Sequence, residues 1–255
     1  MFTVIKAVLI DLSGTIHIDD AEIRGSIESL NKLRHLERSI KFVTNTTKES
    51  RAMLVKRLHR IGFQIEPQEI FTCLTAARKM IDSRNLSPLL LLDDRALEDF
   101  TGIPQDQFDS VVVGLAPEKF NYGSMNHALR LVLGGSPLIA VHKARYYKRK
   151  DGLALGPGPF VSALEYAADC QSQVVGKPEA AFFLSAIEEF NVHPEECVMI
   201  GDDARDDVVG AIRAGMKGIL VKTGKYRQGD ERHLPPEAVV ADDFPSAVDM
   251  LTSET

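Results

Sequence analysis

Apolar residues in this chain follow two patterns that alternate along its length. Continuous apolar runs at 7–10 and 197–200 indicate strands buried on both faces, as in a parallel sheet, and the short β-type run 40–43 predicts another strand. Between the runs 7–10 and 40–43, apolar residues recur at helical spacing and predict an amphipathic helix over residues 22–36. Strands and helices continue to alternate to about residue 80, an order that is typical of a doubly wound parallel sheet.

The alternation restarts after residue 80. Apolar runs at 88–92, 110–114 and 138–141 predict further strands, with a helix over 125–133. The stretch 145–152 is basic and aromatic, and two interpretations of it stay open. It is either a solvated loop or a rim that attracts an anionic substrate.

The last third of the chain returns to the first pattern. Strands are predicted at 218–221 and 239–241, and helices over 208–216 and 245–251. The polar stretch 223–237 is rich in turn residues and is interpreted as a loop.

Composition narrows the class of protein. The chain has 255 residues, 44% of them hydrophobic and 26% charged, as in ordinary globular proteins. Its net charge of −6 argues against general nucleic-acid binding. No apolar run approaches the ~20 residues that cross a membrane, and the N-terminus does not resemble a secretion signal. Cys73, Cys170 and Cys197 are scattered and predict three buried thiols, so we expect a cytoplasmic protein.

Oxygen-rich side chains follow three of the predicted strands. These are Asp11, the pair Thr44 and Asn45, and Asp202, with Lys177 at a fourth position. A parallel sheet brings the carboxyl ends of its strands to one edge, so these groups are expected to converge. Two carboxylates suit Mg²⁺, while a hydroxyl, backbone N–H groups and an ammonium would neutralise phosphoryl oxygens. A carboxylate that faces a phosphoryl group can attack it and form an aspartyl-phosphate.

Each of these groups also has a structural interpretation. Thr44 and Asn45 would serve as a helix cap, and Lys177 as a surface lysine. The acids at 202–207 would be a solvated helix N-terminus, which the helix dipole favours. Asp11 alone would cap a helix or brace a turn. The occurrence of all four in this order favours the catalytic interpretation.

Four segments resemble, in this order, the four motifs of the haloacid dehalogenase superfamily of phosphatases. They are Asp11-Leu12-Ser13-Gly14-Thr15, Val43-Thr44-Asn45, Gly176-Lys177-Pro178 and Gly201-Asp202-x4-Asp207. The resemblance covers nearly the whole chain and implies an α/β fold with a doubly wound, Rossmann-like core at 1–80 and 175–255. The inserted residues 81–174 resemble the α/β cap of the branch that contains pyridoxal phosphatase-like enzymes. Such a cap would exclude water and set substrate choice.

The resemblance implies a role for each motif residue. Asp11 would be the nucleophile, and Lys177 would orient it and compensate charge. Mg²⁺ would be bound by Asp11, the Ser13 carbonyl and Asp202, with Asp207 supporting the site from behind. The residues implied to bind the phosphoryl group are Asp11, Leu12, Ser13, Thr44, Asn45 and Lys177.

Ser13 departs from the family pattern. Most phosphatases of the superfamily have Asp there, which protonates the leaving oxygen and then activates water. An ordinary serine hydroxyl cannot serve as that acid and base. His17 is a candidate replacement, although a histidine beside a turn is more often structural. We therefore predict a Mg²⁺-dependent phosphatase that favours good leaving groups. The alternative is a non-catalytic phospho-ligand or protein-binding module that retains the fold.

The expected partner is a small phosphorylated substrate, without nucleic acid or membrane. Candidate contacts from the basic stretch are Lys143, Arg145, Lys148 and Arg149, if their loop faces the core. The resemblance also implies a homodimer through the cap.

Overall fold

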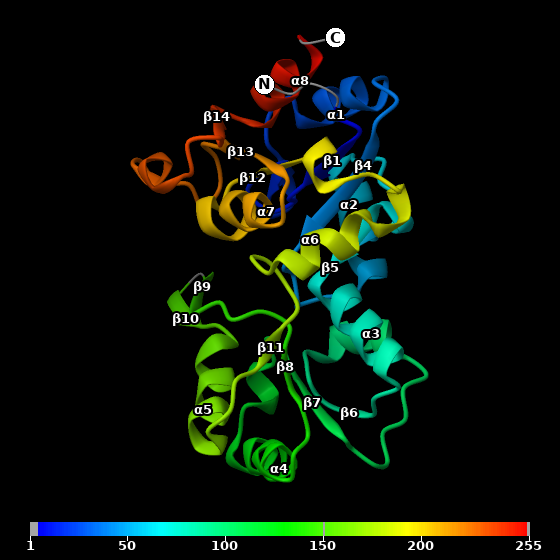
Figure 1. The fold of residues 1–255 in the computed structure, drawn as a ribbon, viewed down its shortest axis with the longest axis vertical. Helices are drawn as coiled ribbons and strands as arrows, with labels where there is room; N and C mark the ends of the chain where they lie inside the picture. The colour runs from blue at the N-terminus through cyan, green and yellow to red at the C-terminus, as the bar shows by residue number, and fades with distance from the viewer. Residues whose placement is uncertain (1–4, 150, 254–255) are drawn as a thin grey trace. The chain divides into compact units, whose positions relative to one another are not determined.

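The chain folds into two compact units in the computed structural model, which describes residues 5–149 and 151–253 (Figure 1). Unit 1 consists of the described residues within Met1–Thr44, Ala52–Phe71 and Lys177–Thr255. Unit 2 consists of Asn45–Arg51 and the described residues within Thr72–Gly176.

These boundaries differ from the predicted ones, which lie at 80/81 and 174/175. The difference arises because the short segment 45–51 and helix α3 (Cys73–Arg84) pack with unit 2. The Cys73 thiol donates to the Thr46 carbonyl at 3.3 Å, and α3 contacts the 3₁₀ segment η2 (Asp94–Phe100).

Unit 1 is built on a six-stranded sheet with the strand order β14-β13-β12-β1-β4-β5. The strands are β1 (Ala7–Ile10), β4 (Ser39–Thr44), β5 (Ile70–Thr72), β12 (Cys197–Gly201), β13 (Lys217–Val221) and β14 (Val239–Ala241). β1 pairs in parallel with β4 and β12, β12 pairs in parallel with β13, and β13 with β14. The predicted parallel-sheet α/β core is therefore confirmed.

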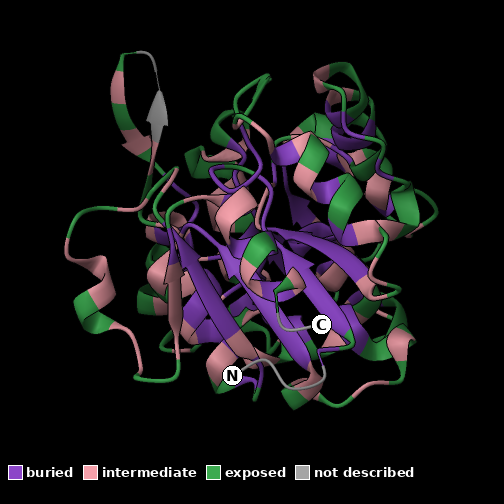
Figure 2. Cartoon of the chain, turned by 90° about the horizontal axis from the view of Figure 1, so that it is seen from above, coloured by how far each residue is buried: buried purple, intermediate pink, exposed green. Residues whose placement is uncertain are grey.

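Helices cover both faces of this sheet, because its strands bury side chains alternately on either side. They are α1 (Ser26–Arg34), α2 (Arg51–Ile61), α6 (Ala180–Ile187), α7 (Gly210–Arg213) and α8 (Phe244–Thr252). Val8 and Ile10 join a cluster with residues of α1, α2 and α8. On the other face, α6 contacts β4 and α7 contacts β13. Figure 2 shows the strands almost wholly buried, whereas the helices expose their outer residues.

Short elements complete unit 1. A hairpin of β2 (His17–Ile18) and β3 (Ala21–Glu22) precedes α1, so the helix predicted over 22–36 begins only at Ser26. Gly25 directly before it has a positive φ of 83°, which turns the chain into the helix. The 3₁₀ turns of unit 1 are η1 (Pro67–Glu69), η4 (Glu188–Phe190), η5 (Pro194–Glu196) and η7 (Asp230–His233).

The helix predicted over 208–216 is confirmed only at Gly210–Arg213, because residues 208 and 209 belong to a different turn and 214–216 lie past the helix end. The chain forms a wide π-helical turn, η6 (Ala204–Val209), before the short helix α7. The Asp203 carbonyl accepts from the N–H of Val208, five residues later, and the Asp203 side chain accepts from the N–H groups of Arg205 and Asp206. This capping widens the turn that carries Asp207.

Unit 2 has its own parallel sheet, with the strand order β11-β8-β7-β6. The strands are β6 (Pro88–Leu91), β7 (Ser110–Val113), β8 (Leu138–Ala140) and β11 (Gln173–Val174). Helices α4 (Tyr122–Leu133) and α5 (Gly158–Ala168) pack on this sheet through a cluster that includes Val111, Val132 and Val161. The 3₁₀ segment η3 (Pro117–Lys119) follows β7.

The basic stretch 145–152 is not a loop. Strand β9 (Tyr146–Arg149) pairs antiparallel with β10 (Gly152–Leu155), and the two form a separate hairpin. The expectation of a solvated loop missed it because β9 is polar and lacks the apolar run that marked the other strands. Residue 150 and the side chains of Lys148 and Arg149 lie outside the described part of the chain.

Two of the three free thiols are buried, namely Cys73 and Cys197. Cys170 is half-buried, so the prediction of three buried thiols is wrong there. It lies just past the end of α5, where only one side of the chain packs against the unit 2 core. Among the described residues, none of the helices combines the length and the apolar character needed to cross a membrane.

Unit 2 holds one well-shielded carboxylate outside the four motifs. Glu165 on α5 accepts from Lys143 Nζ at 2.7 Å. It also accepts from the Ser172 N–H at 2.9 Å and the Ser172 hydroxyl at 2.7 Å. Burial acts to raise the pKa of Glu165, but the hydrogen bonds from Lys143 and Ser172 outweigh it and lower the pKa.

Glu165 is therefore expected to stabilise the protein at neutral pH and to lose this effect in acid. Because its folded-state pKa is depressed, the stabilisation is present above the unfolded pKa of about 4.3 and is lost as the pH falls through the folded-state value. At neutral pH, Glu165→Gln should lower the free energy of unfolding by roughly 1–3 kcal/mol, measured by urea denaturation. The exposed Glu118 provides the control Glu118→Gln. A deficit that stays constant into strong acid would contradict this role.

Candidate active site

The predicted site residues of unit 1 lie at neighbouring strand ends. Asp11 follows β1, Thr44 is the last residue of β4, and Asp202 follows β12. β1 lies between β4 and β12 and runs parallel to both, so their carboxyl ends share one edge of the sheet. Three of these side chains are buried, at 6% exposure for Asp11, 5% for Thr44 and 1% for Asp202.

Lys177 joins two of the acids. Its Nζ donates to Asp11 Oδ1 and to Asp207 Oδ1, both at 2.6 Å, and to the Val43 carbonyl at 3.3 Å. Burial acts to lower the pKa of Lys177, but the charges of Asp11 and Asp207 outweigh it and raise the pKa. The ammonium is therefore held charged between two carboxylates.

Three carboxylates surround a space suited to a cation. Asp11, Asp202 and Asp207 each place an oxygen within 4.8 Å of the others. Burial, together with the charges of Asp11 and Asp207, raises the pKa of Asp202. Asp202 Oδ1 is buried and has no hydrogen-bond partner among the described residues. Buried carboxylate oxygens that lack donors fit a hard divalent cation such as Mg²⁺.

The three acids are not equivalent. Both oxygens of Asp207 already accept hydrogen bonds, Oδ1 from Lys177 and Oδ2 from the Asp203 N–H at 3.1 Å. Asp11 Oδ2 has one long contact, 3.4 Å to the Thr15 hydroxyl. Asp11 and Asp202 thus keep oxygens for a ligand, whereas Asp207 braces Lys177. The supporting role that the resemblance implies for Asp207 stays a prediction.

Two glycines allow these acids to come so close. A Cβ at Gly201 would lie 2.3 Å from Asp207 Oδ2, so only glycine lets the η6 turn fold back over the end of β12. A Cβ at Gly14 would lie 2.1 Å from Asp202 Oδ2, and Gly14 also has a φ of +98°. At these glycines of the first and fourth motifs, a larger residue would therefore clash with a carboxylate of the site.

The remaining predicted residues have different surroundings. Leu12 is buried, and Ser13 is exposed and forms a β-bridge with His17. Asn45 directly follows Thr44 but belongs to unit 2. His17 is 1% exposed, and its Nδ1 donates to the Asp19 carbonyl at 2.9 Å, a contact within the β2–β3 hairpin. The roles of these residues stay predictions.

Sequence reasoning missed three residues at this site. The Thr15 hydroxyl contacts Asp11, the Thr223 hydroxyl donates to the Gly14 carbonyl at 2.5 Å, and the Lys225 N–H donates to Asp202 Oδ2 at 2.6 Å. The last two follow β13, which is itself a parallel strand next to β12. The carboxyl ends of parallel strands meet at one edge of the sheet, and this rule could have identified Thr223 and Lys225 as well. The stretch 223–237 contains no motif, however, and was interpreted only as a loop.

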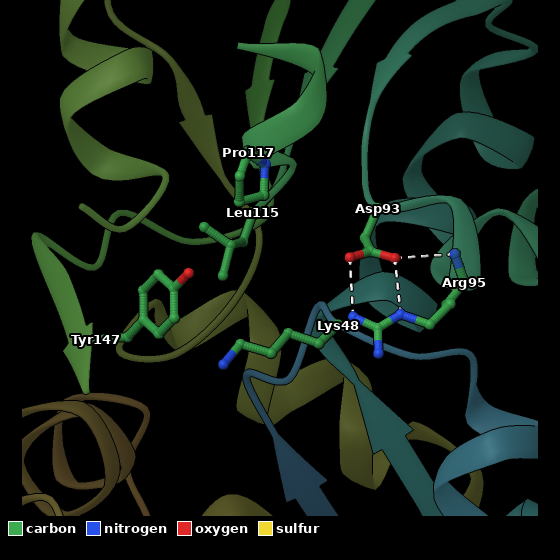
Figure 3. A pocket seen from close by; sticks show the side chains of 6 residues that line it. All are labelled: Lys48, Asp93, Arg95, Leu115, Pro117 and Tyr147. Atoms are coloured by element: carbon green, nitrogen blue, oxygen red, sulfur yellow. Dashed lines mark hydrogen bonds and ion pairs between the residues drawn. The ribbon is translucent and has the colours of Figure 1, made fainter. Parts of the chain in front are cut away.

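The two basic candidates whose side chains the structure describes, Lys143 and Arg145, have different partners. Lys143 pairs with Glu165, and the Arg145 guanidinium lies 5.7 Å from the Tyr146 ring. A separate cavity of about 260 Å³ lies within unit 2. It is lined by Lys48, Asp93, Arg95, Leu115, Pro117 and Tyr147 (Figure 3).

Charge is unevenly distributed in this cavity. Lys48 Nζ lies 4.2 Å from the centre of the Tyr147 ring, a cation–π contact. On the other side, Arg95 makes a forked ion pair with Asp93 at 3.0 Å, and this hydrogen bond lowers the pKa of Asp93 (Figure 3). The ionised side chains of the lining are thus two cations, Lys48 and Arg95, and one carboxylate, Asp93, which is paired with Arg95.

Two family models match the chain. The model described as haloacid dehalogenase-like hydrolase matches residues 8–101, and a second, HAD-hydrolase-like, matches residues 174–247. Together they cover both segments in which the four motifs lie.

Named proteins match over nearly the whole length. The chain is 59% identical to human (Homo sapiens) haloacid dehalogenase-like hydrolase domain-containing protein 2, with 96% of this chain and 95% of that protein covered. It is 39% identical to human phospholysine phosphohistidine inorganic pyrophosphate phosphatase, with 97% and 94% covered. The solved p-nitrophenyl phosphatase from Archaeoglobus fulgidus superposes with a TM-score of 0.89 at 27% identity, covering 97% of this chain and 100% of that one.

Proposed function

Because the chain belongs to the haloacid dehalogenase-like hydrolase family and is a phosphatase-type hydrolase of that superfamily, we propose a specific reaction for it. The protein transfers a phosphoryl group to Asp11 with the help of Mg²⁺ and then releases orthophosphate. The observation that carries this proposal is the buried cluster in which Lys177 donates to one oxygen of Asp11, while the other oxygen has, among the described residues, a single long contact.

In the first step, Asp11 Oδ2 attacks phosphorus and forms the aspartyl-phosphate. The bond from phosphorus to the leaving group breaks, and the leaving group departs with the electron pair and takes a proton from solvent. Lys177 holds Oδ1 and so fixes the direction of attack. Water then attacks phosphorus, gives a proton to solvent, and frees orthophosphate and the Asp11 carboxylate.

Asp11, Asp202 and the Ser13 carbonyl would bind Mg²⁺, and Asp207 would support the site through Lys177 and the Asp203 N–H. When bound, the ion would screen the charge of Asp11 from that of the phosphoryl oxygens. Thr44 and the backbone N–H groups of residues 12, 13 and 45 would hold those oxygens.

Ser13 leaves the reaction without its usual acid and base. General acid–base catalysis typically raises the reaction rate ~10²–10⁴-fold, and its loss lowers the rate most when the leaving group is poor. The substrates are therefore expected to carry P–N, pyrophosphate, acyl-phosphate or aryl-phosphate bonds. This class agrees with the substrates in the name of the human phospholysine phosphohistidine inorganic pyrophosphate phosphatase.

A panel of leaving groups tests the role of Ser13. The kcat/KM of the wild type should fall steeply from 4-nitrophenyl phosphate to alkyl phosphates. Ser13→Asp restores a carboxyl group and should raise turnover of alkyl phosphates by roughly 10–100-fold, with little change for 4-nitrophenyl phosphate. Ser13→Asn matches the shape of Asp without its proton and is the control. Comparable turnover of alkyl and aryl esters by the wild type would refute this interpretation.

The proposed reaction as a whole is tested by release of phosphate from 4-nitrophenyl phosphate and pyrophosphate. The rate should disappear in EDTA and return with Mg²⁺. We propose that unit 2 is the cap and sets substrate choice. The proposal also includes a homodimer through this cap and a cytoplasmic location. Size-exclusion chromatography with light scattering checks the homodimer.

A further inference from the structure

A short loop after β13 connects the first and fourth motifs. Thr223, Gly224 and Lys225, here named the 223–225 loop, follow the carboxyl end of that strand. β13 pairs in parallel with β12, and Gly201 pairs with Leu220. The loop therefore starts beside the strand end that carries Asp202.

Two hydrogen bonds join the loop to different motifs. The Thr223 hydroxyl donates to the Gly14 carbonyl at 2.5 Å, three residues after Asp11. The Lys225 backbone N–H donates to Asp202 Oδ2 at 2.6 Å. In addition, Lys225 Nζ lies 3.4 Å from Asp203 Oδ2, on the residue that caps η6. One three-residue segment thus contacts the turn after the nucleophile and the acid of the fourth motif.

Gly224 lies against both partners. A Cβ at this position would lie 2.1 Å from Asp202 Oδ2 and 2.4 Å from the Gly14 Cα. Its φ of +56° is also one that favours glycine. A Cβ at Gly14 would also lie 2.1 Å from this oxygen, so both glycine backbones lie close to Asp202 Oδ2, which accepts from the Lys225 N–H.

The other oxygen of the same carboxylate has a different environment. Asp202 Oδ1 is buried and finds no hydrogen-bond partner in the described part of the chain. Fixing Oδ2 hinders the carboxylate from exchanging its two oxygens, so Oδ1 remains the oxygen without a hydrogen-bond partner. The same carboxylate belongs to the group in which Asp11, Asp202 and Asp207 each place an oxygen within 4.8 Å of the others.

We propose that the 223–225 loop is a positioning element that orients Asp202 and the Ser13–Gly14 turn so that Asp202 Oδ1 and the Ser13 carbonyl meet the same Mg²⁺. The inference rests on the proposed function for the identity of the ion. Thr223, Gly224 and the Lys225 backbone act through other residues and do not touch the substrate. Groups that orient metal ligands in this way typically change metal affinity about 10–100-fold when they are removed.

The first test uses a pair of glycine substitutions in the full chain. Gly224→Ala inserts a methyl group against Asp202 and Gly14, whereas Gly229→Ala adds it where nothing lies within 4 Å, at a φ of +103°. Isothermal titration calorimetry with Mg²⁺ alone should show at least about tenfold weaker binding for Gly224→Ala and less than about a twofold change for Gly229→Ala. Thermal unfolding of both variants shows that they are folded.

The second test removes a single hydroxyl. Thr223→Val keeps the shape of the side chain but cannot donate to Gly14, whereas Thr223→Ser keeps the donor. We expect Thr223→Val to weaken Mg²⁺ binding by about tenfold, and Thr223→Ser to restore it. With 4-nitrophenyl phosphate, Thr223→Val should need more Mg²⁺ for half-maximal rate, while KM at saturating Mg²⁺ stays near the wild-type value.

The outcomes separate this inference from the proposed function. Wild-type Mg²⁺ affinity in folded Gly224→Ala and Thr223→Val would overturn the positioning role, even if the wild type hydrolyses phosphate. Mg²⁺ binding that weakens as expected in a protein without phosphatase activity would support the positioning role and refute the proposed reaction. A wild type that gives no heat with Mg²⁺ would overturn both.

Discussion

Asp11→Asn is expected to lower the rate of Mg²⁺-dependent phosphate release by at least ~10³-fold. The amide has nearly the size of the carboxylate, so it fits the buried position beside Lys177. It cannot attack phosphorus as an anion, so the aspartyl-phosphate does not form. Release of orthophosphate from 4-nitrophenyl phosphate and pyrophosphate measures the effect.

The same substitution should not destabilise the fold. Asp11, Asp202 and Asp207 repel one another at close range, and Asp11→Asn removes one of the three charges. The unfolding midpoint without Mg²⁺ is therefore expected to equal or exceed that of the wild type. Asp249→Asn, at an exposed ion pair with Lys32, is the matched control and should keep full activity.

Equal residual rates in the wild type and Asp11→Asn would refute the proposed reaction. That result would instead favour the alternative function, a non-catalytic phospho-ligand or protein-binding module. Loss of activity together with loss of structure would instead contradict the argument that the amide fits the site.

Of the substitutions proposed for this protein, Lys177→Met is expected to lower the free energy of unfolding most, by about 3–5 kcal/mol. Lys177 is 4% exposed, and both of its carboxylate partners are buried. Methionine fills a similar volume but leaves Asp11 and Asp207 without a compensating charge. Urea denaturation at neutral pH measures the loss, and catalysis should disappear with it.

Adding a second substitution distinguishes the loss of charge compensation from a change in side-chain packing. In Lys177→Met/Asp207→Asn one of the two uncompensated charges is gone, so part of the lost stability should return. Lys32→Met, at an exposed ion pair, should leave the urea midpoint nearly unchanged. A double variant no more stable than Lys177→Met would show that charge compensation is not what Lys177 contributes.

Several elements could be predicted from local sequence because their signals are local. The apolar runs at β1 and β12 are buried on both faces, and such strands need no partner information to be recognised. The π-helical turn η6 could not be predicted in this way. Its shape depends on Asp203 capping the turn and on Asp207 reaching Lys177, and both are contacts of the folded chain.

The hairpin of β9 and β10 was not predicted because β9 lacks the local signal that marked the central strands. β9 carries two tyrosines among basic residues and contains no apolar run, so local sequence did not predict its pairing with β10. The boundary between the units was misplaced for a similar reason. Helix α3 has an ordinary amphipathic pattern, which says that one face is buried but not which unit buries it.

The amino-acid sequence by itself determined which residue types end the central strands, and the strand-end rule for parallel sheets was enough to expect Asp11, Thr44 and Asp202 at one edge. The tertiary structure alone decided how these groups share their charges and hydrogen bonds. Lys177 is paired with Asp11 and Asp207, both oxygens of Asp207 accept hydrogen bonds, and Asp202 has a buried oxygen without a partner among the described residues. These properties depend on angstrom-scale distances between residues up to 209 positions apart in the chain, from Gly14 to Thr223, and no local pattern encodes them.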